Sequence, residues 1–505
     1  MPGAGVRLAS ASGSLRRDRR IALWLGAAAF LAYLPFVHGH FTGTDEMGVF
    51  LTTRALYEEG GFEVRAGPHR FRGREGRTFA HFAPGLPVLA LPFYALGDAA
   101  ERSLPGRWVE ALCGRPAEPE RIDTRGSPQT FAVALYPALA SAVLVALFFL
   151  VERRLGASVE SALAASALLG GGTYVATHSV YFLRHTTETI PWLASFLALL
   201  AYREGGRVRD LALGSLWASL TLLIAVPATV GVPALAGYGL FAAWPRLRRA
   251  GTVERARLLA AGLLPALLVV ALHAIHNRAL WGAWLESPMV AQRHGFTTPL
   301  HVGLAGFLLS PGVSLFVYSP PLLLAGLMLP SFWRERRAEC VTALAAALSM
   351  LVFCAGFSHW HGLWSAPGPR YLFVLTPLLL LPLGRWLDAH ASRRARQALW
   401  ALGAAGLTVQ LVLLLSRWSA VIRGMGYVEA AQRGDLSFLW VPWRSPLAGS
   451  ARALGEGQLD AWWMGLATGF DGGEAAPGAA TLLFGVWASG AVLVWIRLRR
   501  QLHGG

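Results

Sequence analysis

Apolar runs, most of them close to the length needed to cross a bilayer, recur along the whole chain and constrain its fold more than any other feature. A membrane-spanning helix needs about 20 mostly apolar residues. Only 15% of the 505 residues are charged, whereas soluble domains carry roughly 25%. The sequence therefore predicts an all-α, polytopic membrane protein with about 12 transmembrane helices. The runs lie at residues 21–37, 128–150, 158–177, 189–202, 210–226, 227–244, 257–276, 313–330, 339–357, 371–388, 398–416 and 479–497.

The positions of the basic residues predict the orientation of the chain. There are 45 basic residues, all of them arginine, against 29 acidic ones, which gives a net charge of +16. Arginines cluster before the first run and in alternate connections, which the positive-inside rule places in the cytoplasm. These connections lie at residues 153–154, 203–209, 246–257, 334–337, 393–396 and 497–500. We expect a multi-pass protein of a bacterial inner membrane, with both chain ends cytoplasmic and no nucleic-acid partner.

This topology predicts the division of the chain. A cytoplasmic segment, 1–20, precedes a transmembrane module, 21–416, whose first external loop covers 39–127. A further external loop, 417–478, is followed by a last transmembrane helix and a cytoplasmic tail, 479–505. Within the first loop, the apolar stretch 84–97 is too short for a span and suits a helix at the membrane interface. The three cysteines are too few for a disulfide framework.

The first loop opens with adjacent carboxylates, Asp45 and Glu46, directly after the first run. A carboxylate beside the membrane can take a proton from an acceptor hydroxyl. The alternative is that Thr44 or Asp45 caps the helix that follows. The two interpretations are compatible.

A basic and aromatic turn follows in the same loop. Arg77 and His81 precede Pro84-Gly85, where they are candidates for holding a phosphate at the membrane surface. The spacing alone favours an ordinary turn that leads into the interfacial helix.

Two further clusters lie where later runs meet the external side. His185 and Glu188 open one helix, and Glu188 is either a cap or a second active-site carboxylate. Arg370 stands at an external span entrance against the charge rule, where it suits pairing with a phosphate. The candidate substrate-binding residues around it are His359, His361, Trp364 and Tyr371.

The two histidines of this loop have the spacing of metal ligands, but no carboxylate or cysteine lies nearby, so we assign no metal. No P-loop and no Rossmann fingerprint occurs in the sequence. A sugar donor, if there is one, is therefore expected to be lipid-linked rather than nucleotide-linked.

The order of these motifs resembles the GT-C superfamily of polytopic glycosyltransferases, which includes protein O-mannosyltransferases and lipid A aminoarabinose transferases. The matching motifs are Thr44-Asp45-Glu46, His81-Phe82-Ala83-Pro84-Gly85-Leu86-Pro87, Arg153-Arg154-Leu155-Gly156, Tyr318-Ser319-Pro320 and the stretch 364–371. The chain departs from relatives that carry Lys or Tyr-Pro-Pro near His81, and from those with an arginine before the proline at Ile224-Ala225-Val226-Pro227.

The resemblance implies an inverting transfer from a polyprenyl-phosphate-linked sugar to a glycan, lipid or protein acceptor. Asp45 would be the general base, and Glu46 or Glu188 would orient the sugar or the acceptor. Arg370, with Arg77 and His81, would neutralise the leaving phosphate. No metal or other cofactor is implied.

Two other classes of function remain open from the sequence. A lipid-linked glycan transporter or polymerase would place charged residues inside its spans, and the apolar runs here are nearly free of charge. A non-catalytic membrane protein that keeps the same fold is the other alternative.

Overall fold

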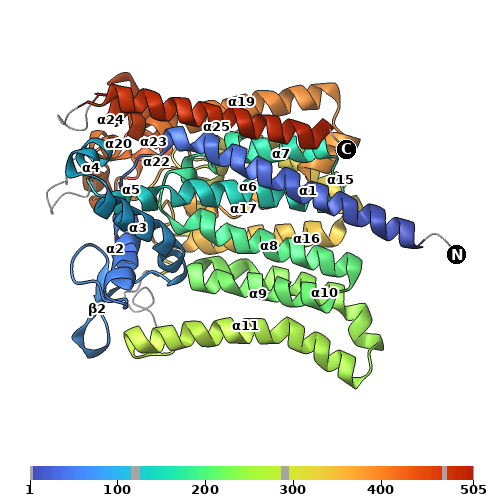
Figure 1. Ribbon diagram of the computed structural model, residues 1–505. Helices are drawn as coiled ribbons and strands as arrows, with labels where there is room; N and C mark the ends of the chain where they lie inside the picture. Colours follow the sequence, from blue (N-terminus) through green and yellow to red (C-terminus); the bar gives the residue numbers. More distant parts are fainter. Residues whose placement is uncertain (1–3, 115–125, 286–294, 469–474, 504–505) are drawn as a thin grey trace.

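Long helices run side by side through the middle of the molecule (Figure 1). The computed structural model describes residues 4–114, 126–285, 295–468 and 475–503. The predicted external loops 39–127, 277–312 and 417–478 each include residues outside these ranges. Ten of the predicted runs coincide with a long helix. These helices are α1 (Ala4–Tyr33), α6 (Tyr136–Leu155), α7 (Val159–Gly172), α8 (Arg184–Gly205), α9 (Val208–Ile224), α10 (Val232–Arg249), α11 (Thr252–Trp281), α16 (Arg337–Gly356), α19 (Arg393–Leu415) and α25 (Pro477–His503).

Five helical segments of the described residues are long and apolar enough to cross a membrane. They are Pro128–Leu155, Thr252–Trp281, Arg337–Gly356, Arg393–Leu415 and Pro477–Leu502. The chain is thus a multi-pass membrane protein by composition and helix length, and the total of about 12 spans stays a prediction. The outward faces of α11 and α25 are apolar, with Leu264 61% and Leu482 70% exposed. Such continuous exposed apolar faces suit contact with lipid.

Two predicted runs are not continuous helices. Residues 313–330 form α14 (Leu315–Tyr318), η5 (Pro320–Leu324) and the start of α15 (Ala325–Glu335), because Pro320 and Pro321 interrupt the helical hydrogen bonds. Residues 371–388 are divided among η6 (Arg370–Leu372), α17 (Leu375–Leu380) and α18 (Leu383–Ala389). Broken backbone at membrane depth is tolerated only where protein covers it, and Phe373 and Leu381 are fully buried.

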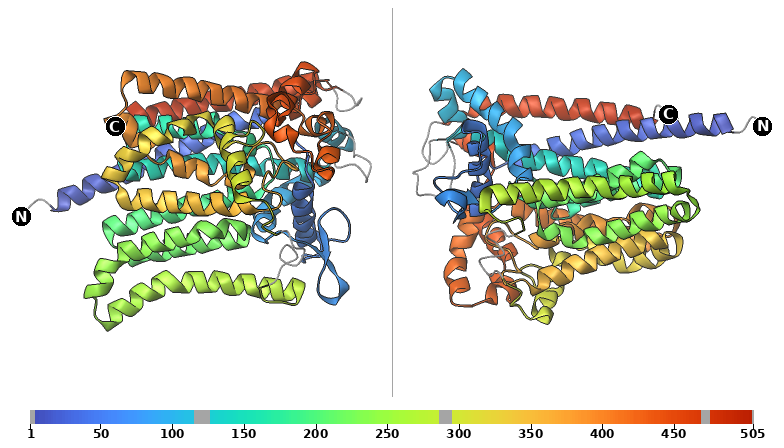
Figure 2. Two further views of the ribbon diagram at one scale, coloured as in Figure 1. Left: turned by 180° about the vertical axis from the view of Figure 1, so that it is seen from behind. Right: turned by 90° about the horizontal axis from the view of Figure 1, so that it is seen from below.

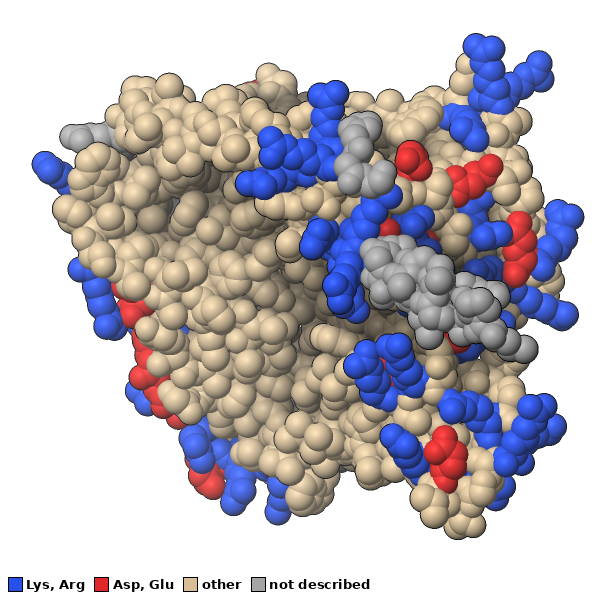
Figure 3. Space-filling model, turned by 45° about the vertical axis from the view of Figure 1, so that its right-hand side comes forward, with Lys and Arg blue, Asp and Glu red and all other residues tan. Residues whose placement is uncertain are grey.

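The arginine-rich connections meet at one end of the bundle. Arg17 donates to the carbonyl of Leu502 at 3.0 Å, so the two chain ends lie together. Arg153 pairs with Asp18 at 3.0 Å, and Arg154 pairs with Glu204 at 2.7 Å. Figure 3 shows arginines gathered at this end and a broad belt without charged residues beyond it. The clustering of these connections at one end is what the predicted topology requires.

The opposite end carries short elements from distant parts of the chain (Figures 1 and 2). The first loop forms α2 (Thr44–Glu58), a two-stranded antiparallel sheet of β1 (Arg70–Arg72) and β2 (Thr78–Ala80), α3 (Gly85–Ser103) and α4 (Gly106–Cys113). Phe71 pairs with Phe79 in the sheet. The short helix expected over 84–97 is present as α3 and extends to Ser103. The chain then enters α6 through α5 (Pro128–Ala134).

The last loop lies against the first. It contains α20 (Trp418–Gly424), α21 (Tyr427–Gln432), α22 (Ser437–Trp440), α23 (Pro446–Gly455) and α24 (Trp462–Thr468). The Nε2 atom of His40 lies 2.8 Å from Oδ1 of Asp460. The backbone amide of Trp462 donates a hydrogen bond to the carbonyl of Val37 at 2.9 Å. The remaining elements of the described ranges are α13 (Leu300–Leu309), η1 (Leu34–Phe36), η2 (Arg74–Gly76), η3 (Thr177–Ser179), η4 (Pro227–Gly231) and η7 (Pro442–Arg444).

Candidate functional site

Asp45 and Arg370 form an ion pair at this end of the bundle. Asp45 lies in the first turn of α2, and Arg370 begins η6, 325 residues later in the chain. The Arg370 Nη1 donates to Asp45 Oδ2 at 2.7 Å. The arginine side chain is 5% exposed, whereas the carboxylate is 23% exposed. The structure therefore joins two residues that are far apart in the sequence, and leaves the carboxylate partly exposed.

A third residue, His69, completes the surroundings of this carboxylate. Its Nε2 lies 3.2 Å from Asp45 Oδ1 and 2.9 Å from Thr44 Oγ1. His69 has a φ of +56°, a backbone conformation that costs a non-glycine residue energy and often occurs at functional sites. His69 was not among the candidates predicted from the sequence. A lone histidine in Gly67-Pro68-His69 carries no signal of a contact with Asp45, because a reversal of the loop creates that contact.

The charge balance around Asp45 keeps it ionised. Burial alone would raise the pKa of this carboxyl group, but the Arg370 guanidinium and His69 outweigh that effect. Together they hold the pKa of Asp45 well below its ordinary value. The group is therefore an acceptor at neutral pH, and it becomes a stronger base if Arg370 moves to another anion.

Glu46 is committed to the backbone. Its Oε2 accepts from the amides of Thr42 at 2.9 Å and Gly43 at 2.8 Å, and its Oε1 accepts from the Phe182 amide at 2.7 Å. Burial raises its pKa to about 7 against the opposing effect of these donors. The helix begins at Thr44 as expected, but the capping residue is Gly43 and Glu46 supplies the side-chain contact. Asp45 is thus free of the capping role.

A second group of polar side chains continues from Arg370. The Arg370 Cζ lies 5.1 Å from the centre of the Tyr371 ring, and that ring is 5.8 Å from the ring of His185. His185 Nδ1 lies 3.1 Å from Glu188 Oε1. Glu188 is in the second turn of α8, whose N-cap is Leu183, so its capping interpretation is wrong. It is a buried carboxylate that also faces Arg184 at 3.3 Å.

The two candidates of the aromatic turn separate in the structure. The His81 ring is 5.2 Å from the His69 ring, which places it beside the Asp45 pair. Arg77 is half-exposed at the sheet and pairs with Glu75 at 2.5 Å. Among the contacts of the described residues, none joins Arg77 to Asp45 or Arg370.

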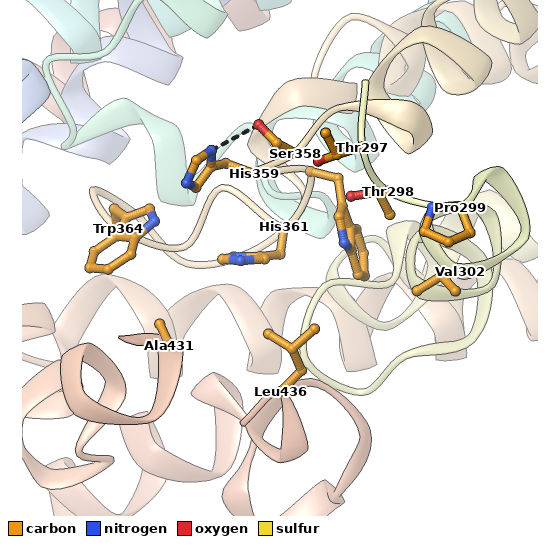
Figure 4. Close-up of a pocket in the computed structure, with 11 residues that line it drawn as sticks. Thr297, Thr298, Pro299, Val302, Ser358, His359, His361, Trp364, Ala431 and Leu436 are labelled. Carbon is orange, nitrogen blue, oxygen red and sulfur yellow. Dashed lines mark hydrogen bonds between the residues drawn. The ribbon is translucent and has the colours of Figure 1, made fainter. Parts of the chain in front are cut away.

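The remaining candidates line a cavity of about 350 Å³ (Figure 4). His359, His361 and Trp364 lie on the loop that leads into Arg370, and the far wall is Ala431 and Leu436 of the last loop. In the described part of the chain, no group of three or more His, Cys, Asp or Glu side chains is placed to hold a metal ion.

The loop that carries these residues also packs on the Asp45 side. A Cβ at Gly43 would meet the Ser365 Cβ at 2.8 Å, and a Cβ at Gly362 would meet Tyr371 Cε2 at 2.9 Å. These close approaches hold the loop 358–371, which carries Arg370 and lines the cavity, against the start of α2.

No protein-family model matches the chain, and no curated protein matches its sequence. The structure is similar to the crystal structure of ArnT from Cupriavidus metallidurans bound to undecaprenyl phosphate, with a TM-score of 0.48 and 15% identity. That match covers 88% of this chain and 77% of ArnT. The crystal structure of an Archaeoglobus fulgidus oligosaccharyltransferase in the apo form is similar with a TM-score of 0.43 and 12% identity, over 78% of this chain and 55% of that one. This chain therefore spans about half the length of the archaeal protein.

Proposed function

We propose that the protein is an integral membrane glycosyltransferase that moves a sugar from a polyprenyl-phosphate-linked donor to an acceptor hydroxyl, with inversion. The ion pair between Asp45 and Arg370 is the observation that carries this proposal. It supplies a carboxylate for the acceptor proton and a guanidinium for the leaving phosphate at one point. The pair lies at the end of the bundle opposite the arginine-rich connections. The positive-inside rule places those connections in the cytoplasm, so in this proposal the pair is at the extracytoplasmic face of a bacterial inner membrane.

In the proposed reaction the acceptor oxygen forms a bond to the anomeric carbon while the bond from that carbon to the phosphate oxygen breaks. The acceptor hydroxyl proton passes to Asp45, and the electron pair of the broken bond stays on the polyprenyl phosphate. Arg370 bonds the phosphate as its negative charge grows, which lowers the barrier. As Arg370 turns to the phosphate, Asp45 loses part of its partner and gains basicity when it must take the proton.

The other polar residues have supporting roles in this proposal. Glu46 is a positioning residue, because its carboxylate ties the start of α2 to the Phe182 backbone and so aims Asp45. His69 and His81 border the donor phosphate from the first loop. Glu188 and His185 reach the same centre through Tyr371 and orient a substrate hydroxyl.

Mass spectrometry of lipid-linked sugars in cells that lack the gene tests this function. We expect one polyprenyl-phosphate sugar to accumulate, and to disappear when the wild-type gene is restored. Restoration with Asp45→Asn leaves the accumulation in place. Asp435→Asn, which alters a partly exposed carboxylate paired with Arg444 in the last loop, is the matched control and clears it. No accumulation in the deleted strain, or clearance by Asp45→Asn, contradicts the proposal.

A further inference from the structure

The cavity beside Arg370 has a lining unlike that of the ion pair. Its polar walls are hydroxyl groups and imidazoles, from Thr297, Thr298, Ser358, His359 and His361. Figure 4 shows these residues on the pocket wall, with Ala431 and Leu436 on the opposite side. Among the described residues that line the cavity there is no arginine, aspartate or glutamate. These groups donate and accept hydrogen bonds without presenting a permanent charge.

Two tryptophans give the same cavity an aromatic wall. Trp360 is 2% exposed and rigidly packed, with its ring 5.4 Å from that of Phe307. Trp364 is 37% exposed and is held by the Tyr427 ring at 4.9 Å. A fixed aromatic surface with one open side suits a ligand that has an apolar face and a polar edge.

Burial keeps the inner histidine neutral. His361 is 6% exposed, and burial, followed by His359 and Arg370, lowers its pKa to about 4. Its Nδ1 lies 3.2 Å from the hydroxyl of Tyr427, which fixes the ring. At neutral pH this side of the cavity therefore offers a hydrogen-bonding imidazole and no cation, and an anionic ligand gains nothing from it.

One loop connects the cavity to the Asp45–Arg370 pair. Residues 358–371 approach Gly43, two residues before Asp45, through Ser365, and they form part of the cavity wall through His361 and Trp364. A volume of about 350 Å³ is at the small end of ligand sites, which span roughly 300–1,000 Å³. It therefore suits one or two small ring-shaped units of a larger substrate.

We propose that this cavity is a saccharide subsite, which binds a neutral sugar residue of one substrate of the transferase. The inference rests on the proposed function, and it narrows the substrate class. The sugar stacks on Trp364, and its hydroxyl groups bond Thr298, Ser358 and His361. The phosphate binds elsewhere, at Arg370. The sugar residue belongs either to the acceptor or to the transferred group of the donor, and the experiment below separates the two.

Saturation-transfer NMR on the full chain in detergent is the direct test, with methyl glycosides of neutral hexoses as probes. We expect transfer to neutral glycosides, and about tenfold weaker binding in Trp364→Ala. Thr298→Val keeps the shape of the side chain and removes the hydroxyl, which donates to the Phe357 carbonyl at 2.9 Å and is left as an acceptor for a sugar hydroxyl, so this variant weakens binding without removing an aromatic ring. Trp443→Ala is the matched control, because Trp443 is 72% exposed and does not line the cavity.

Absence of a signal from every neutral glycoside, or equal signals from wild type and both cavity variants, overturns the subsite. Stronger binding of a glucuronide than of the neutral glycosides also overturns it. Asp45→Asn keeps glycoside binding, so loss of the proposed transfer activity and loss of the subsite are distinct results.

In the transfer assay, Trp364→Ala raises KM for the substrate whose sugar occupies the cavity. If KM rises for the acceptor, the sugar in the cavity belongs to the acceptor. If KM rises for the donor, that sugar is the group transferred from the donor.

Discussion

Asp45 has two neighbours that favour its ionised form and an environment that opposes it. Arg370 and His69 contact different oxygens of the carboxylate, so neither replaces the other. Asp45 and Arg370 were both candidates from the sequence, because each is a charged residue at the predicted external end of a span, where the positive-inside rule does not account for it. Their contact was not predicted, because it joins positions 325 residues apart. His69 escaped prediction for the same reason, since nothing in its local sequence indicates the loop reversal.

The lowered pKa of Asp45 makes a pH-dependent contribution to stability. A carboxyl group whose pKa is lower in the folded chain than in the unfolded chain stabilises the fold above its unfolded pKa, and loses that contribution as pH falls through its folded pKa. We therefore expect wild type to have a higher apparent melting temperature than Asp45→Asn at pH 7. The gap should narrow as pH falls below about 4, the ordinary value for aspartate. Melting curves of both proteins in detergent check this, and a gap that is constant with pH contradicts it.

Among the helices, α2 is positioned by the side chain of Glu46, which turns back to the backbone amides at the start of the helix. Glu46 accepts hydrogen bonds from two amides that precede the helix and one from Phe182, and so links the first loop to the start of α8. Helix locations were predictable at this scale, because apolar periodicity and length are local properties. The breaks in 313–330 and 371–388 were not predicted. Proline signals them, but burial by neighbouring helices decides whether a broken helix is stable.

We expect Glu46→Gln to destabilise the protein, because the amide of glutamine would present a donor to one of the backbone donors. A buried group left without its hydrogen-bond partner costs about 1–3 kcal/mol. Glu75→Gln is the control, since Glu75 is 54% exposed and pairs only at the surface. Thermal unfolding in detergent measures the difference. If both variants unfold at the same temperature, Glu46 does not position α2.

At the scale of the whole molecule, the two ends of the bundle differ in what they carry. One end holds the arginine-rich connections and both chain ends, and the other holds the first and last loops (Figure 2). The Asp45–Arg370 pair and the cavity lie at this second end. This division followed from the positions of arginine in the sequence. The packing of the last loop on the first did not, because contacts such as His40 with Asp460 join residues with no local pattern in common.

Cysteine labelling measures the orientation of these ends. The three native cysteines are buried, so they give little background. A membrane-impermeant maleimide applied to intact spheroplasts should label Ala66→Cys, which lies in the exposed part of the first loop. Arg249→Cys, at the arginine-rich end, should react only after the membrane is opened. The reverse pattern would place the site on the cytoplasmic side and contradict the proposed topology.

The transfer rate of the purified protein in liposomes, with a synthetic polyprenyl-phosphate sugar as donor, decides whether the Asp45–Arg370 pair is the catalytic centre. The donor is chosen from the lipid-linked sugar that accumulates in cells without the gene. Loss of a general base lowers a rate by about 10²–10⁴-fold, and we expect that fall for Asp45→Asn while Asp435→Asn keeps the wild-type rate. Sugar transfer by Asp45→Asn at the rate of the control would show that the Asp45–Arg370 pair is not the catalytic centre.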